Sequence, residues 1–179
     1  MTFSDKNNAQ SISQETRIEN GFYVMRYKNE EVVKQQITRA VKQDFIQLHF
    51  CIKGATLFSF NDGNYTIPLA EENLLLLYNP VQQLPMNIEV DANSWLITVL
   101  ISIKKFHSLF STEANYISFL SEENKNQKYY KDGSISPSMA IALNQVMNYS
   151  LHPSLQELYF KGKCYESVSY THLTLPTKA

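Results

Sequence analysis

Over its first hundred residues the chain alternates short apolar segments with turn residues. Runs of aromatic and β-branched residues begin at Phe22 and are interrupted by polar residues, glycine or proline. They predict strands at residues 22–27, 32–41, 45–52, 55–60, 65–69, 74–78, 86–90 and 95–103. Because no long helical segments separate these runs, the pattern predicts an antiparallel β-barrel or sandwich and not a parallel sheet.

Two segments define this β-rich region further. The run 45–52 is apolar enough on both faces to be buried on both, with Gln47 and His49 on one face and Leu48 and Phe50 on the other. Alternation alone therefore does not determine which face lines the interior. The segment Asn61–Asn64 (Asn-Asp-Gly-Asn) predicts a tight hairpin, since glycine adopts a positive φ at little cost.

After residue 104 the apolar spacing becomes helical. Short helices are expected at 105–110 and 115–120, with a polar loop over 122–132. Ser136 followed by Pro137 predicts a helix start, because proline at the first helical position lacks only an N–H that would be unpaired anyway. An antiparallel helix pair is then expected, and its dimerisation or docking residues are predicted to be Met139, Leu143, Val146, Met147, Leu155, Leu158 and Tyr159.

Four regions are expected along the chain: a flexible N-terminus (1–20), a β-barrel (21–105), a helical linker or dimerisation region (106–166) and a tail (167–179). The fold class is thus mainly β with C-terminal helices. The tail departs from the helical pattern, and from Val168 to Thr177 it resembles the translation of a transposase-derived sequencing adapter. We therefore expect the tail to be non-native and the natural protein to continue differently after Glu166.

Composition narrows the class of protein. The chain is 44% hydrophobic and 18% charged, with a formal net charge of −1, which is typical of a globular domain and offers no basic surplus for nucleic-acid phosphates. Cys51 and Cys164 form neither a disulfide framework nor a zinc pattern. No signal peptide or membrane span is apparent, so a cytoplasmic setting without membrane partners is expected.

Candidate chemistry is sparse. A barrel of this kind resembles the cupins, whose metal needs two histidines two positions apart, a carboxylate and a third histidine. Gln47 and His49 occupy the corresponding strand, so neither a metal nor another cofactor is expected, and no catalytic residue is assigned. Instead Gln47 and His49 would hydrogen-bond a small effector, with Trp95 and Tyr65 as aromatic pocket residues. The alternative for all four is ordinary core packing.

Several segments together resemble the AraC family of bacterial transcription regulators, in the type found in Bacteroidota. They are residues 50–54 leading into the hairpin, 74–80, 100–110, 135–144 and 151–163, and the last two are similar to that family's linker helices. The resemblance implies a cupin-like domain that senses an effector or forms a homodimer, followed by a domain with two helix-turn-helix motifs. No such second domain lies within these 179 residues, so DNA binding is expected only through a missing C-terminal domain.

The chain is therefore expected to be a fragment that senses and self-associates, and not an enzyme. Two alternatives remain open at this point: a stand-alone cupin-type metalloenzyme, and a small-molecule-binding module with no regulatory role. A metal site would favour the first.

Overall fold

The computed structural model describes residues 12–109, 128–148 and 153–174. The predicted fold class is confirmed, since about half of these residues lie in antiparallel strands and helices follow them. In chain order the elements are β1 (Ile12–Glu19), β2 (Phe22–Asn29), β3 (Gln35–Arg39), β4 (Phe45–Lys53), β5 (Ala55–Phe60), β6 (Tyr65–Ala70), β7 (Asn73–Tyr78), β8 (Met86–Val90), β9 (Ser94–Ser102), α1 (Ile103–Leu109), β10 (Tyr129–Ser134), α2 (Pro137–Met147) and α3 (Pro153–Thr174).

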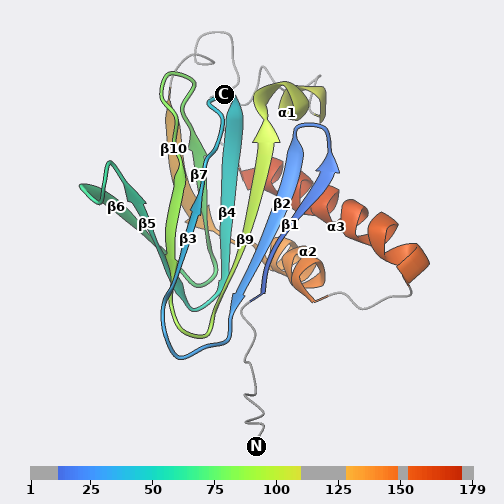
Figure 1. The fold of residues 1–179 in the computed structure, drawn as a ribbon. Helices are drawn as coiled ribbons and strands as arrows, with labels where there is room; N and C mark the ends of the chain where they lie inside the picture. Colours follow the sequence, from blue (N-terminus) through green and yellow to red (C-terminus); the bar gives the residue numbers. More distant parts are fainter. Residues whose placement is uncertain (1–11, 110–127, 149–152, 175–179) are drawn as a thin grey trace, which may run out of the picture.

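The strands form two sheets that pack as a sandwich. One sheet has six strands in the order β1-β2-β9-β4-β7-β10, and the other has four in the order β3-β8-β5-β6. The helices α2 and α3 lie over the larger sheet on the side away from the smaller sheet, and α1 follows β9 at one end (Figure 1). We call that end, where α1 lies, the mouth of the sandwich.

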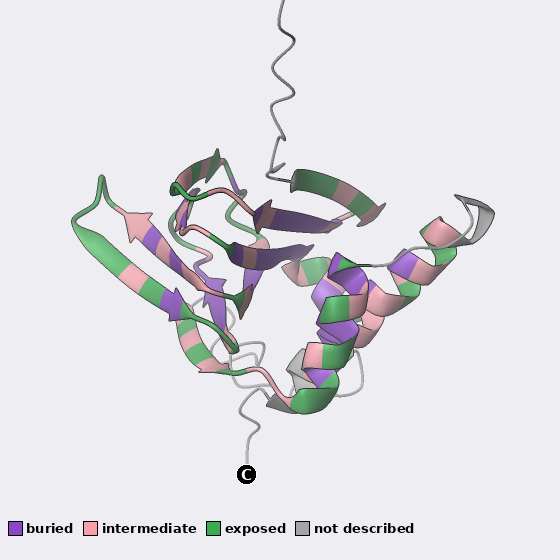
Figure 2. Cartoon of the chain, turned by 90° about the horizontal axis from the view of Figure 1, so that it is seen from below, coloured by how far each residue is buried: buried purple, intermediate pink, exposed green. Residues whose placement is uncertain are grey.

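Two apolar clusters fill the space on either side of the larger sheet. The cluster under the helices includes Ile46, Leu48 and Phe50 of β4, whereas the cluster between the sheets includes Cys51 of the same strand. β4 is central and covered on both sides, which explains why both of its faces are apolar. The face carrying Gln47, His49 and Cys51 is therefore the interior face. Figure 2 shows buried residues on both the strands and the facing helices.

The predicted hairpin is confirmed at the tip of β5 and β6. Asn61, Asp62 and Gly63 all have positive φ, at 52°, 54° and 86°, and the Asn64 N–H donates to the Asn61 carbonyl at 3.1 Å. Asparagine, aspartate and glycine tolerate this left-handed backbone better than other residues do. The local sequence thus sets the turn without help from the rest of the fold.

Both edge strands of the six-stranded sheet differ from the prediction. Residues 12–19, expected to be flexible, form β1 and pair with β2, and residues 129–134, expected to form a loop and part of a helical region, form β10 and pair with β7. Each strand is polar along most of its length because an edge strand faces solvent. Neither therefore has the apolar run that marks an inner strand. The expected helix at 115–120 lies outside the described residues.

The apolar stripe of α2 packs inside the protein. Met139, Leu143, Val146 and Met147 are all buried in the cluster between α2, α3 and the larger sheet. This corrects the expectation that these four residues form an exposed docking surface, because the stripe is needed to cover the outer face of the sheet. The predicted start of α2 is confirmed, since the Ser136 hydroxyl accepts a hydrogen bond from the Met139 N–H at 3.2 Å.

Helix α3 presents a mixed surface. Leu158 is 74% exposed and Tyr159 is half-buried, while the side chain of Leu155 lies outside the described residues. The helix continues through residue 174. Ser167 and Val168 are both buried, and Val168 belongs to the apolar cluster under the helices. The expected break in the helical pattern at residue 167 is therefore wrong, whereas the adapter origin of the tail stays a prediction. No described helix has the length and apolar character of a membrane span.

Candidate functional site

The polar residues of the interior face form a closed network. His49 is fully buried between the sheets, with its Nδ1 2.7 Å from the Thr98 hydroxyl and its Nε2 2.9 Å from Gln47 Oε1. The Gln47 amide nitrogen donates to the Leu84 carbonyl at 2.7 Å. Because the Gln47 oxygen can only accept, His49 carries its proton on Nε2 and accepts from Thr98 at Nδ1. Each of the three side chains thus has a hydrogen-bond partner within the protein.

Burial also keeps His49 neutral. Desolvation lowers the pKa of His49 from 6.5 to about 3, because the interior penalises the charged imidazolium. The ring lies 4.5 Å from the Phe58 ring, centroid to centroid, so it packs as part of the core as well. These contacts match the alternative given above for His49, a satisfied core histidine.

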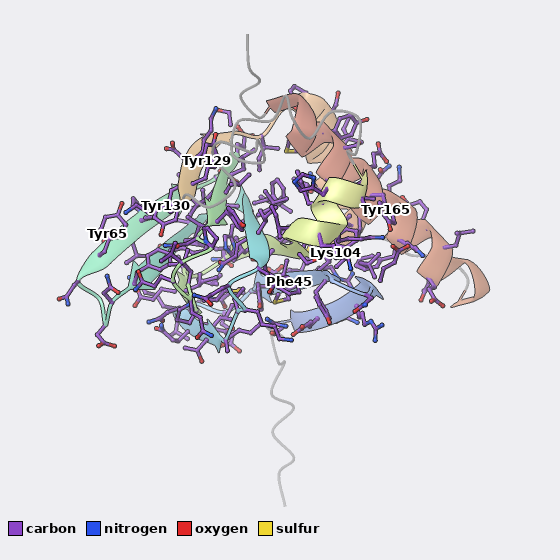
Figure 3. The ribbon with its side chains drawn as sticks, turned by 90° about the horizontal axis from the view of Figure 1, so that it is seen from above. Phe45, Tyr65, Lys104, Tyr129, Tyr130 and Tyr165 are labelled. Carbon is purple, nitrogen blue, oxygen red and sulfur yellow. The ribbon has the colours of Figure 1, made fainter. Side chains whose placement is uncertain are left out.

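The structure brings Gln47 and His49 together but places Trp95 and Tyr65 elsewhere. Trp95 lies on the helix-facing side of β9, donates to Glu30 Oε1 at 2.9 Å and sits beneath the ammonium groups of Lys28 and Lys53. Tyr65 is 53% exposed near the hairpin tip, far to one side of the molecule (Figure 3). The four predicted pocket residues therefore do not share one pocket.

No metal-ligand set is assembled in the part of the chain that the structure describes. No group of three or more His, Cys, Asp or Glu side chains lies close enough there to hold an ion. His49 is engaged with Gln47 and Thr98, and Cys51 is buried with its pKa raised to about 11, mainly by desolvation. These residues do not fit a cupin-type metal centre.

A different site lies at the mouth. Two neighbouring hollows there share Tyr23, Lys42 and Phe45 in their walls, and we call them together the mouth pocket. One, of about 290 Å³, is lined by Tyr23, Arg39, Ala40, Val41, Lys42, Phe45 and Gln83. The other, of about 410 Å³, is lined by Asn20, Gly21, Tyr23, Lys42, Asp44, Phe45, Ser102, Lys104, Lys105 and Ser108. Both volumes are large enough for a small organic molecule.

Backbone pairing fixes the walls of the mouth pocket. Phe45 begins β4 directly opposite Ser102 of β9, and the Ile103 N–H donates to the Asp44 carbonyl at 2.7 Å. The Ser102 N–H donates to the Gly21 carbonyl at 2.8 Å, which ties the β1–β2 turn to the same corner. Gly21 has a φ of +77°, and a Cβ there would lie 2.7 Å from Ser102 Oγ, so this close approach requires glycine.

The mouth pocket combines aromatic surface with surplus positive charge. The rings of Tyr23 and Phe45, which line both hollows, lie 6.0 Å apart between centroids. Of the cations in its walls, Arg39 pairs with Glu15 and Lys105 with Glu19. Lys42 and Lys104 are exposed and have no ion-pair partner among the residues the structure describes, and Asp44 is the one acidic residue in the walls. Such a lining suits a molecule with an apolar body and a negative group.

Sequence reasoning did not find the mouth pocket. Its residues come from segments spread along the chain between Asn20 and Ser108, so no local motif joins them. The available signal was weak: Lys42 and Lys104 each adjoin the end of a predicted strand, where charged residues are common. Figure 3 shows Phe45 and Lys104 at this end of the molecule, on different elements.

Comparison with protein-family models and with curated proteins finds no match. Among solved structures, apo ToxT from Vibrio cholerae strain SCE256 is similar, with a TM-score of 0.47 and 10% identity over 87% of this chain and 58% of that one. ToxT of the same strain with bound unsaturated fatty acid has a TM-score of 0.46 and 13% identity, over 86% of this chain and 55% of that one.

An RmlC-like cupin from Desulfovibrio desulfuricans has a TM-score of 0.41 and 12% identity, over 56% of this chain and 96% of that one. The chain thus spans little more than half the length of the ToxT chains it matches. At these identities and TM-scores, the likenesses carry no functional argument for this chain.

Proposed function

We propose that the chain is the effector-sensing part of an AraC-type transcription regulator, and that its effector binds in the mouth pocket. The observation that carries the proposal is the contrast between a closed interior, where Gln47, His49 and Thr98 bond to one another, and an open mouth, where Lys42 and Lys104 lack ion-pair partners among the described residues. Small-molecule sites typically combine apolar and aromatic walls with a few charged or polar groups that contact the ligand.

The proposed role is binding and not catalysis. The mouth pocket offers lysines, an arginine, an aspartate and two serines, with no metal-ligand group and no pair of acid and base arranged for proton transfer. We further propose that the protein self-associates and that it contacts DNA through a domain following α3. Its net charge of −1 agrees with DNA binding residing outside these residues.

The site is tested with three small molecules that share one ring and differ in charge: benzoate, benzamide and benzylamine. Each is titrated into ¹⁵N-labelled full chain, and amide shifts are followed by NMR. We expect shifts at Tyr23, Lys42 and Phe45 and none at His49 or Thr98. A Phe45→Ala variant is expected to lose them, with Tyr65→Ala as a matched aromatic control. If all three molecules change amide shifts only at residues outside the mouth pocket, the proposed site is refuted.

The regulatory part of the proposal is tested at the gene. Resequencing the source DNA beyond the Glu166 codon is expected to reveal a frame that continues into two helix-turn-helix segments with a basic surplus. A frame that stops within a few codons would instead favour a free-standing binding module.

A further inference from the structure

The β1–β2 turn touches both the mouth pocket and helix α3. Asn20 and Gly21 line the pocket, whereas the residues on either side of them contact α3. Glu19 pairs with Lys161 of α3 at 2.7 Å, and the Phe22 ring packs edge-on against the Tyr165 ring at 5.3 Å between centroids. The residues that line the pocket are thus adjacent in the chain to the residues that contact α3.

Lys105 belongs to both sites. Its side chain lines the mouth pocket, and its ammonium group also pairs with Glu19. Glu19 is therefore shared between Lys105 on the pocket side and Lys161 on the α3 side. Figure 3 shows Lys104 of α1 and Tyr165 of α3 on adjacent elements at this end of the molecule. An acceptor bound in the pocket would compete with Glu19 for the same ammonium group.

The charges at this junction are fixed at physiological pH. Hydrogen bonds from Lys105, Lys161 and Tyr165 lower the pKa of Glu19 to about 2, and the bond to Glu19 raises the pKa of Lys105. Glu19 therefore stays an anion and Lys105 a cation, so the competition is between two anions for one cation and is independent of protonation.

We propose that the effector is a small organic anion, and that it signals by drawing Lys105 away from Glu19, which leaves Glu19 more fully available to Lys161 and so strengthens the contact between the β1–β2 turn and α3. The inference rests on the sensing function proposed above and adds the effector's chemical class and its route to α3. Tyr23 and Phe45 would contact the apolar body of the anion, and Lys42, Lys104 and Lys105 would hold its negative group. Because coupling is reciprocal, whatever weakens the hold of Glu19 on Lys105 must also strengthen anion binding.

The first test measures the benzoate dissociation constant, with benzamide as the neutral control of the same shape. Wild-type protein is expected to bind benzoate more tightly than benzamide. Glu19→Gln, which keeps the shape and removes the charge, is expected to tighten benzoate binding about fivefold, at the low end of typical coupling between sites, and to leave benzamide unchanged. Lys104→Ala is expected to weaken benzoate binding equally in both backgrounds.

The second test asks whether α3 senses the pocket. Lys161 is not part of the pocket wall, and its loss leaves Glu19 more fully available to Lys105. Lys161→Met is expected to weaken benzoate binding about two- to threefold, and to have no effect when combined with Glu19→Gln, as a double-mutant cycle requires. Lys163→Met, on the same helix but paired with Glu166, is the matched control and is expected to leave benzoate binding unchanged.

Hydrogen exchange gives an independent readout. Benzoate is expected to slow amide exchange over residues 156–166 in wild-type protein and not in Glu19→Gln, because Glu19 released from Lys105 holds Lys161 more tightly. Unfolding midpoints verify that each variant folds, and Lys161→Gln replaces Lys161→Met if the latter does not. If benzoate binds but neither Glu19→Gln nor Lys161→Met differs from Lys163→Met, the relay is refuted and the pocket stands. If benzamide binds and benzoate does not, the anionic effector is refuted while the sensing site remains.

Discussion

The interior and the mouth of the sandwich both place polar side chains beside aromatic rings, yet the two regions differ in what those side chains contact. Inside, Gln47, His49 and Thr98 bond to one another, and His49 packs on Phe58. At the mouth, Lys42 and Lys104 face a hollow beside Tyr23 and Phe45. Burial explains the difference, because an unpaired polar group is costly inside a protein and costs almost nothing at its surface. Interior polar residues therefore stabilise the fold, whereas Lys42 and Lys104, which have no ion-pair partner among the described residues, are available to a ligand.

The sharpest test of this comparison is His49→Ala. It removes a fully buried ring, leaves the Gln47 oxygen and the Thr98 hydroxyl without a partner, and opens a cavity against Phe58. We expect a loss of about 3 kcal/mol in the free energy of unfolding, measured by urea denaturation. A loss below about 1 kcal/mol would show that the interior network contributes little to stability.

The pH dependence of stability should report the same network. The pKa of His49 is lowered from 6.5 to about 3, so its contribution to stability is complete above pH 6.5 and declines as the pH falls toward 3. Between pH 7 and pH 5.5 we expect the free energy of unfolding to fall by about 1 kcal/mol through this residue. Glu19 and Glu166, with lowered pKa values, lose their contribution only below their usual value of 4.5.

The measurement compares wild-type protein with His49→Gln at both pH values. The glutamine keeps a buried polar side chain and does not titrate, so its unfolding free energy should change less over this interval. Equal pH slopes for the two proteins would argue that His49 is accessible to protons in the folded state.

Substitutions at the mouth should have the smallest effect on stability. Lys42→Ala and Lys104→Ala each remove an exposed cation without an ion-pair partner among the described residues. We expect each to change the free energy of unfolding by no more than about 0.5 kcal/mol, while weakening benzoate binding in the NMR titration. A large loss of stability on either substitution would mean that the lysines of the mouth pocket stabilise the fold, as the interior polar residues do.

Much of the fold was predictable because its signals are local. The inner strands β4, β7 and β9 carry long apolar runs, the Asn61–Gly63 turn carries residues that accept positive φ, and Ser136 caps α2 as its sequence indicates. The edge strands β1 and β10 were not predictable in this way, because their polar residues face solvent and their pairing depends on β2 and β7. Continuation of α3 past residue 166 likewise depends on burial of Val168 against the sheet.

The sequence by itself determined the antiparallel β class, the hairpin, the start of α2 and the absence of a histidine pair on β4. Only the tertiary structure decided which face of β4 is interior, that the α2 stripe covers a sheet, and that Tyr23, Lys42, Phe45 and Lys104 meet at one mouth. The physical reason is range. Backbone preferences and capping act between neighbouring residues, so the sequence alone indicates them. A pocket is formed by segments that are distant in the sequence, so its lining depends on how those segments pack in the folded protein.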